Sequence, residues 1–70
     1  MYQRVEGRVK SIVRQKGFGF IRDMSGGEWF FHKSECQPKG MFDVLNEGDA
    51  VEFNMTQSDK GPRAEDVREV

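Results

Sequence analysis

The sequence predicts an all-β fold, in which five short strands close into one small antiparallel barrel. Apolar and polar residues alternate with a period of two through most of the chain, and clusters of Gly, Pro, Asp and Ser interrupt the alternation. No stretch with helical periodicity reaches normal helix length. Because a flat sheet of a few short strands has unprotected edges, closing the sheet is the most stable arrangement for 70 residues.

The first three strands are expected in the N-terminal half. In residues 4–10, small or apolar residues alternate with charged ones. Residues 17–22 alternate again, and a turn cluster at residues 23–27 follows them. Residues 28–32 then form a third short run that is rich in aromatic side chains.

The second half is expected to contain one long loop and two strands. Residues 33–48 lack any period and contain one proline and two glycines, so we expect a loop, with a single helical turn near residues 34–36. Residues 50–56 alternate clearly. A turn at residues 58–62 leads to a last strand from about residue 63 to residue 70.

The composition fits one globular domain over residues 1–70. Charged residues make up 33% of the chain and hydrophobic residues 36%. The single cysteine, Cys36, cannot form an internal disulfide and is typical of a reducing compartment. No apolar run has the length of a signal peptide or of a membrane span. We therefore expect a cytoplasmic monomer.

The charge is distributed unevenly along the chain. Residues 1–40 carry eight Lys or Arg and four Asp or Glu, a net charge of +4, whereas residues 41–70 carry three and eight, a net charge of −5. This asymmetry is compatible with one positive face on an acidic molecule. Chance placement of solvated surface charge explains it equally well.

Alternation assigns the aromatic side chains to two faces of the sheet. The five-residue turn between the second and third strands predicts antiparallel pairing. The core is expected to contain Val9, Ile21, Trp29, Phe31, Val51, Phe53 and Met55. The outer face is expected to contain Phe18, Phe20, Arg22, Phe30 and His32.

An exposed patch of phenylalanines inside a rim of cations is typical of a surface that binds single-stranded nucleic acid. Bases stack on the rings, and Lys or Arg contacts the phosphates. The basic residues expected around the patch are Arg8, Lys10, Lys16, Arg22 and Lys33. The alternative is that all six phenylalanines belong to the core. Gly17 and Gly19, which flank Phe18, favour the binding surface, because glycine inside a strand often marks a close approach by a ligand or another backbone.

Catalytic and metal sites are not expected. His32 and Cys36 are four residues apart, but the chain has no second His or Cys to complete a zinc site, nor the third group that a cysteine nucleophile needs. We predict no catalytic residue, no metal and no cofactor, and therefore a protein that is not an enzyme.

Six ordered motifs resemble the cold-shock domain family, and they cover nearly the whole chain. The motifs are Gly7-Arg8-Val9-Lys10, Lys16-Gly17-Phe18-Gly19-Phe20-Ile21, Phe30-Phe31-His32, Leu45 with Gly48, Val51 with Phe53, and Lys60-Gly61-Pro62 with Ala64 and Val67. The resemblance implies a five-stranded antiparallel Greek-key barrel of the OB type. It also implies binding of single-stranded RNA or DNA, in the manner of RNA chaperones or antiterminators, without a cofactor.

The resemblance also implies individual binding residues. Those at matching family positions are Lys10, Phe18, Phe20, Phe30, His32, Phe42 and Lys60, where Phe42 matches if one extra residue is allowed before it. Lys16 and Lys33 join this expected site as members of the basic rim.

Two departures from the family pattern motivate a second hypothesis. The family's Lys-Trp-Phe-Asn opening reads Lys10-Ser11-Ile12-Val13 here, so its exposed tryptophan is missing. The family's Phe after the motif histidine is replaced by Lys33. The alternative function is a protein-interaction barrel that has lost most of its affinity for nucleic acid.

Overall fold

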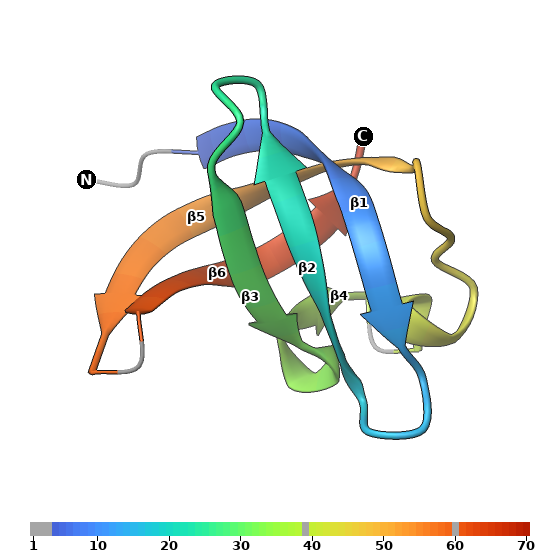
Figure 1. The fold of residues 1–70 in the computed structure, drawn as a ribbon. Helices are drawn as coiled ribbons and strands as arrows, with labels where there is room; N and C mark the ends of the chain where they lie inside the picture. The colour runs from blue at the N-terminus through green and yellow to red at the C-terminus, as the bar shows by residue number, and fades with distance from the viewer. Residues whose placement is uncertain (1–3, 39, 60) are drawn as a thin grey trace.

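The computed structural model describes residues 4–38, 40–59 and 61–70, which form mainly strands (Figure 1). The strands are β1 (Arg4–Val13), β2 (Phe18–Asp23), β3 (Glu28–His32), β4 (Cys36–Gln37), β5 (Ala50–Ser58) and β6 (Gly61–Glu69). Two single-turn 3-10 helices lie between β3 and β5, namely η1 (Lys33–Glu35) and η2 (Met41–Asp43). The five expected strands and the helical turn after the third are confirmed, and the two-residue β4 is an addition.

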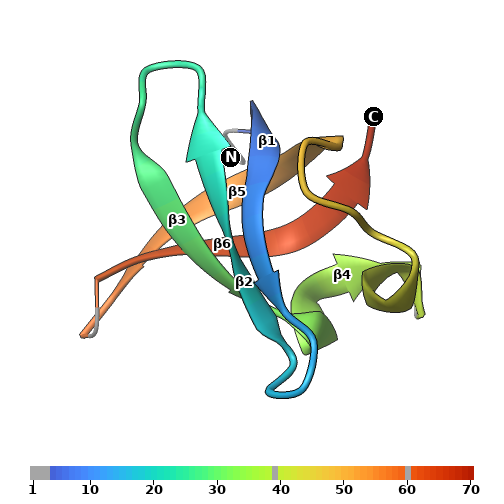
Figure 2. The ribbon, with the colours of Figure 1, turned by 45° about the vertical axis from the view of Figure 1, so that its right-hand side comes forward.

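The five long strands close into a barrel, as predicted. Neighbours in the order β3-β2-β1-β5-β6 pair antiparallel. β6 then returns to β3, where Phe30 pairs with Arg63 in parallel orientation. The short β4 also pairs parallel with β6, at Val67 and Arg68. Figure 2 shows the tip of the β5–β6 hairpin extending to the side opposite β4.

A bulge explains why β1 is longer than expected. Val9 pairs with Ile21 and Ser11 pairs with Phe20, so Lys10 is an extra residue that has no partner on β2. The bulge reverses the alternation after Lys10, because Ile12 rather than Ser11 then lies opposite Gly19. A strict period of two therefore ends at residue 10, whereas the strand continues to Val13.

The core fills the inside of the barrel. Its side chains are at most 5% exposed, and they are Val9, Ile21, Phe31, Cys36, Met41, Phe42, Leu45, Val51, Phe53, Ala64 and Val67. Trp29 is partly buried and packs on Phe53, with 5.9 Å between the ring centroids. The predicted core is confirmed at Val9, Ile21, Phe31, Val51 and Phe53, whereas Trp29 lies partly buried at its edge and Met55 lies outside it.

Met55 is 38% exposed, so its expected place in the core is wrong. Among the described residues, the last pair between β5 and β1 joins Asn54 to Arg4. Beyond Asn54, the described partner of β5 is β6, in the projecting hairpin. Met55 therefore continues the alternation that buries Val51 and Phe53, but it lies in the hairpin, outside the interior of the barrel.

The segment between β4 and β5 contributes Met41, Phe42 and Leu45 to the core. Arg14, just after β1, holds this segment in place. Its guanidinium donates to the carbonyl oxygen of Phe42 at 2.8 Å and to that of Leu45. These bonds satisfy backbone acceptors in a stretch that has few ladder hydrogen bonds.

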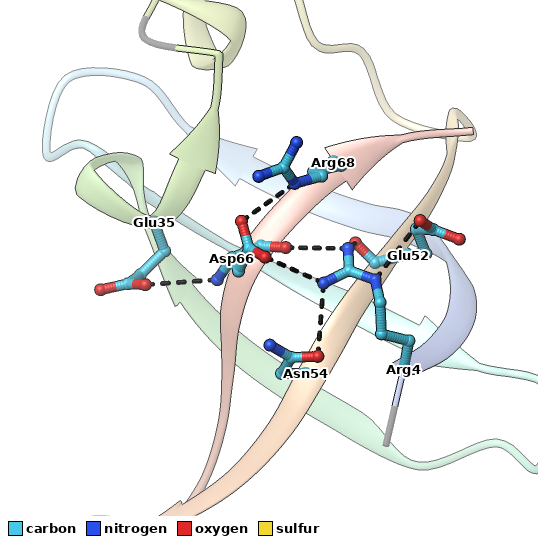
Figure 3. A network of polar contacts seen from close by, with 6 residues as sticks. All are labelled: Arg4, Glu35, Glu52, Asn54, Asp66 and Arg68. Carbon is cyan, nitrogen blue, oxygen red and sulfur yellow. Dashed lines mark hydrogen bonds and ion pairs between the residues drawn. The ribbon is translucent and has the colours of Figure 1, made fainter. Parts of the chain in front are cut away.

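A polar network around Arg4 fastens a bulge in β6 (Figure 3). Asp66 has φ 51°, a left-handed conformation that aspartate tolerates better than most residues. Arg4 donates to the Asp66 carboxylate and carbonyl oxygens, both at 3.0 Å, and its Nε donates to Glu52 at 3.3 Å. The Asp66 N–H donates to Glu35 of η1 at 3.3 Å. The network therefore joins β1, β5, β6 and η1.

The part of the chain that the structure describes contains no helix with the length and apolar character that a membrane span requires.

Candidate nucleic-acid interface

Three parallel rows of side chains cross the outer face of β1, β2 and β3. Each row follows from the strand register, in which Phe18 pairs with His32, Phe20 with Phe30 and Arg22 with Glu28. On β1, these rows continue to Val13, Ser11 and Arg8, respectively. The register excludes a one-residue slip in β3, which would have placed Trp29, Phe31 and Lys33 on this face.

The middle of the face is an aromatic cluster, which consists of Phe18, Phe20 and Phe30. The ring centroids are 5.5 Å apart for Phe18 and Phe30, 6.0 Å for Phe20 and Phe30, and 6.1 Å for Phe18 and Phe20. All three side chains remain partly exposed, whereas Phe31 and Phe53 are fully buried. The structure thus brings the three expected stacking residues together, outside the core.

Gly19, on the side of β2 opposite this cluster, allows β1 and the Phe31 ring to pack closely against the β2 backbone. A Cβ at Gly19 would lie 2.6 Å from the Ser11 carbonyl oxygen and 2.8 Å from the Phe31 ring. Any side chain there would collide with the backbone of β1 and with the core. The close approach that the glycine suggested is therefore to the protein's own β1 and Phe31.

Cations and one carboxylate share the next row of the face. Lys10 Nζ lies 2.6 Å from Glu28 Oε2, and Arg22 donates to the same oxygen at 3.2 Å. Hydrogen bonds from Lys10 and then Arg22 lower the pKa of the Glu28 carboxyl, so it stays ionised. Two of the expected phosphate contacts are thus engaged by a carboxylate in the free protein.

His32 has a fixed orientation because it caps η1. Its Nδ1 accepts the Ser34 backbone N–H at 3.1 Å and lies 3.0 Å from the Ser34 hydroxyl. A ring whose Nδ1 accepts a backbone N–H carries its proton on Nε2 when neutral. His32 can therefore offer both a flat ring and an N–H donor beside Phe18.

Two lysines, Lys16 and Lys33, lie beside Gly17, next to the Phe18 end of the aromatic cluster. Lys33 is exposed, and its backbone N–H donates to the Gly17 carbonyl oxygen at 2.8 Å. Its methylene stem lies over Gly17, where it would contact a Cβ at 3.0 Å. Lys16 is also exposed, and it precedes Gly17 in the loop between β1 and β2. Lys60, the remaining cation of the expected site, lies outside the described residues.

Phe42 is not on this surface, so its expected placement at the binding face is wrong for this structure. It is only 4% exposed and packs against Phe31, with 6.1 Å between the ring centroids. η2 directs both Met41 and Phe42 inward. The motif alignment could match the residue but not its direction, because the preceding loop differs in length from the family pattern.

Trp29 lies on the core side of β3, as alternation predicts. Its indole N–H donates to the Asp23 carboxylate at 2.7 Å. This bond is the main cause that lowers the pKa of Asp23, and backbone N–H groups of the β2–β3 turn add to it. A side-chain carboxylate thus satisfies the indole donor of this partly buried ring.

Arg63 is a residue that the sequence reasoning missed. It extends the middle row of the face from Phe30 onto β6, with its guanidinium carbon 5.9 Å from the centroid of the Phe30 ring. Only the non-local pairing of β3 with β6 brings it there. The order of the motifs along the chain gave no signal of that contact.

Nucleophile and metal chemistry finds little support among the described residues. The Cys36 thiol is buried, and burial followed by the charge of Glu35 raises its pKa to about 11. It is therefore a protonated core side chain at neutral pH. Within residues 4–38, 40–59 and 61–70, no three His, Cys, Asp or Glu side chains gather at metal-binding distance.

Comparison with known proteins identifies the family to which this barrel belongs. Residues 5–70 match the family model described as "'Cold-shock' DNA-binding domain". A cold shock-like protein of Thermotoga maritima is 41% identical over 66 residues, which cover 94% of this chain and 98% of that protein. Cold shock protein ScoF of Streptomyces coelicolor is 45% identical over 62 residues, which cover 87% of this chain and 91% of that protein.

Cold shock protein CapB of Pseudomonas syringae is 43% identical over 68 residues, which cover 97% of each chain. These matches span the barrel, the aromatic face and the closing strand together. The chain therefore belongs to the cold-shock domain family, whose members are generally nucleic-acid-binding proteins.

Proposed function

We propose that this protein binds single-stranded RNA or DNA by stacking bases on its outer face. The observation that carries the proposal is the aromatic cluster. Three partly exposed phenylalanine rings lie within 5.5–6.1 Å of one another on one face of the sheet. A soluble domain rarely leaves such a patch without a ligand. In this proposal His32 adds a further stacking ring, and Lys10, Lys16 and Lys33 contact phosphates.

The geometry favours unpaired strands over a duplex. Stacking on a ring requires a base that is splayed out of its own helix, and this is possible only in a single strand, a loop or a bulge. Each base that stacks on the protein is unavailable for base pairing. The protein therefore acts as an RNA chaperone or an antiterminator, which opens hairpins by competing for their bases without ATP, and it acts as a monomer.

A second candidate function is a protein-interaction barrel with little affinity for nucleic acid. Two observations favour it. Ser11 occupies the β1 position beside Phe20 where the family pattern has tryptophan, and Glu28 already binds both Lys10 and Arg22. Both features weaken the face as a binding site for a polyanion.

A mobility-shift titration with labelled oligo-U and oligo-dT at low salt separates the two functions. We expect binding well below about 100 µM, the weak end of non-specific affinity. The double variant Phe20→Ala/Phe30→Ala should abolish it, whereas Arg68→Gln, which alters a residue of the Arg4 network, should not. No shift at about 100 µM would favour the interaction barrel.

Hairpin opening is tested separately. A fluorophore–quencher hairpin should brighten at constant temperature when the protein is added, without ATP. The same double variant serves as the control. If oligonucleotides bind but the hairpin stays closed, the protein binds single strands without chaperone activity.

A further inference from the structure

A small cavity lies beside the aromatic cluster, between residues of β2, β3 and the β5–β6 hairpin. Figure 1 shows β6 crossing behind β3. Its volume is about 280 Å³, and its lining residues are Phe20, Phe30, Ser58, Pro62 and Arg63. Pockets for drug-sized ligands begin at roughly 300 Å³, so this one suits a single flat ring system. Two of the lining residues, Phe20 and Phe30, also belong to the aromatic cluster.

Arg63 is the cationic member of the cavity. Its guanidinium carbon lies 5.9 Å from the Phe30 centroid, and its Nε is buried without a hydrogen-bond partner among the described residues. Buried polar atoms are almost always paired, and Arg presents its donors as a rigid planar fork. A desolvated donor with no partner in the part of the chain that the structure describes points to an acceptor supplied by a ligand.

The chemistry of the bases selects among the ligands that could fill this cavity. Guanine presents two adjacent acceptors, O6 and N7, that match the guanidinium fork. On the same Hoogsteen edge, adenine places a donor beside N7, cytosine presents only its amino donor, and thymine presents one acceptor, O4, beside a methyl group. A phosphate would have to lose its hydration against Phe20, Phe30 and Pro62, which disfavours it.

We propose that this cavity is a guanine-selective subsite, in which Arg63 reads O6 and N7 of one base while Phe30 and Pro62 enclose its ring. The inference rests on the proposed binding of single strands and adds sequence selectivity to it. One guanine at one end of the bound strand is recognised, while the bases on Phe18 and His32 are held by stacking alone.

The test uses oligo-dT of about six nucleotides, within the usual site size of one such barrel, with a single dG placed at each position in turn. Fluorescence anisotropy measures the affinities. One position should bind roughly 5- to 150-fold more tightly than unsubstituted oligo-dT, the discrimination expected of one bidentate pair. Replacing that base by 7-deazaguanine, which lacks N7, should remove most of the gain, whereas inosine, which keeps O6 and N7, should preserve it.

Arg63→Gln should abolish the preference while oligo-dT itself still binds. Arg63→Lys keeps the charge but lacks the planar fork, so it should also lose the preference, and it remains informative if Arg63→Gln fails to fold. As a matched control, Arg22→Gln should weaken all oligonucleotides alike. A uniform loss in Arg63→Gln would instead identify a phosphate contact and overturn the subsite.

The outcomes separate this inference from the proposed function. If the wild-type protein binds oligo-dT but shows no position at which dG improves affinity, the subsite is refuted and single-strand binding stands. If none of the oligonucleotides binds, the proposed function fails and the subsite fails with it.

Discussion

At the scale of single residues, the two sets of phenylalanines differ in what they stabilise. Phe20 lies on the outer face, next to both Phe18 and Phe30, whereas Phe53 is fully buried. Phe20→Ala should weaken oligonucleotide binding by about 1–3 kcal/mol. It should change the free energy of unfolding by about 1 kcal/mol or less.

Phe53→Ala is the matched comparison, because it removes the same side chain from the core and should cost about 3–5 kcal/mol of stability. Chemical denaturation measures both. If Phe20→Ala unfolds the protein while its folded fraction binds normally, the outer face is not the stacking surface.

Glu28 competes with phosphate for Lys10 and Arg22. The carboxylate accepts from both cations, so a bound strand must displace it or share them. Glu28→Gln removes the negative charge and frees both cations, and should tighten binding at low salt by no more than about fivefold. The gain should shrink as salt screens the charges.

The control is Glu65→Gln, which removes an exposed carboxylate on β6. Equal effects of the two substitutions would mean that only net charge matters and that the contact with Lys10 does not.

At the scale of elements, the β2–β3 hairpin depends on the charge of Asp23. The carboxylate accepts the Trp29 indole N–H and the backbone N–H groups of Ser25 and Gly27. These bonds lower its pKa below the ordinary value of 3.8. The folded form therefore binds this proton less readily than the unfolded form, and the contribution to stability is complete above about pH 4 and is lost as pH falls through the folded-state pKa.

Trp29 fluorescence reports on this change. In the wild type, emission should shift on acidification below about pH 4. Asp23→Asn should show the shifted emission at neutral pH and no further local change in acid. An identical acid response in both proteins would assign the transition to other carboxylates.

Much of the barrel is predictable because its determinants are local. A five-residue turn and strict alternation fix the register of β2 and β3, and with it the face of Phe18, Phe20, Phe30 and His32. The bulge at Lys10 breaks the alternation, so the second half of β1 is hidden from a search for period two.

The missed features depend on contacts between distant parts of the chain. The parallel pairing of Phe30 with Arg63 creates the cavity beside the cluster, and no local pattern announces it. The inward turn of Phe42 follows from core space beside Phe31. Met55 is exposed because β5 extends into the β5–β6 hairpin, past the last pair with β1 that the described residues form, at Asn54.

At the scale of the whole molecule, Arg4 joins the first strand to the last two. Its side chain is 29% exposed and bonds to Glu52, Asn54 and Asp66. Arg4→Ala should lower the free energy of unfolding by about 1–2 kcal/mol, because several charge-assisted bonds are lost together. In a domain of this size each kcal/mol corresponds to roughly 4–8 °C in Tm.

The matched control is Arg68→Ala, because Arg68 is 57% exposed and makes one ion pair with Asp66. It should change stability by about 0.5 kcal/mol or less. Thermal unfolding followed by circular dichroism compares the two variants. Equal Tm values for them would show that the network around Arg4 is no stronger than an isolated surface pair.

The cap that His32 provides to η1 has a consequence for amide hydrogen exchange. Glu35, within the same turn, accepts the N–H of Asp66 on β6. Under the proposed function, a base stacked on His32 would hold the cap in place, so we expect transient opening of η1 to become rarer and the Asp66 amide to exchange more slowly. The exchange rate of the Asp66 amide would then depend on ligand binding at a face to which Asp66 does not belong. Glu35→Ala, which removes the acceptor of that amide, should abolish this dependence without altering the aromatic rings.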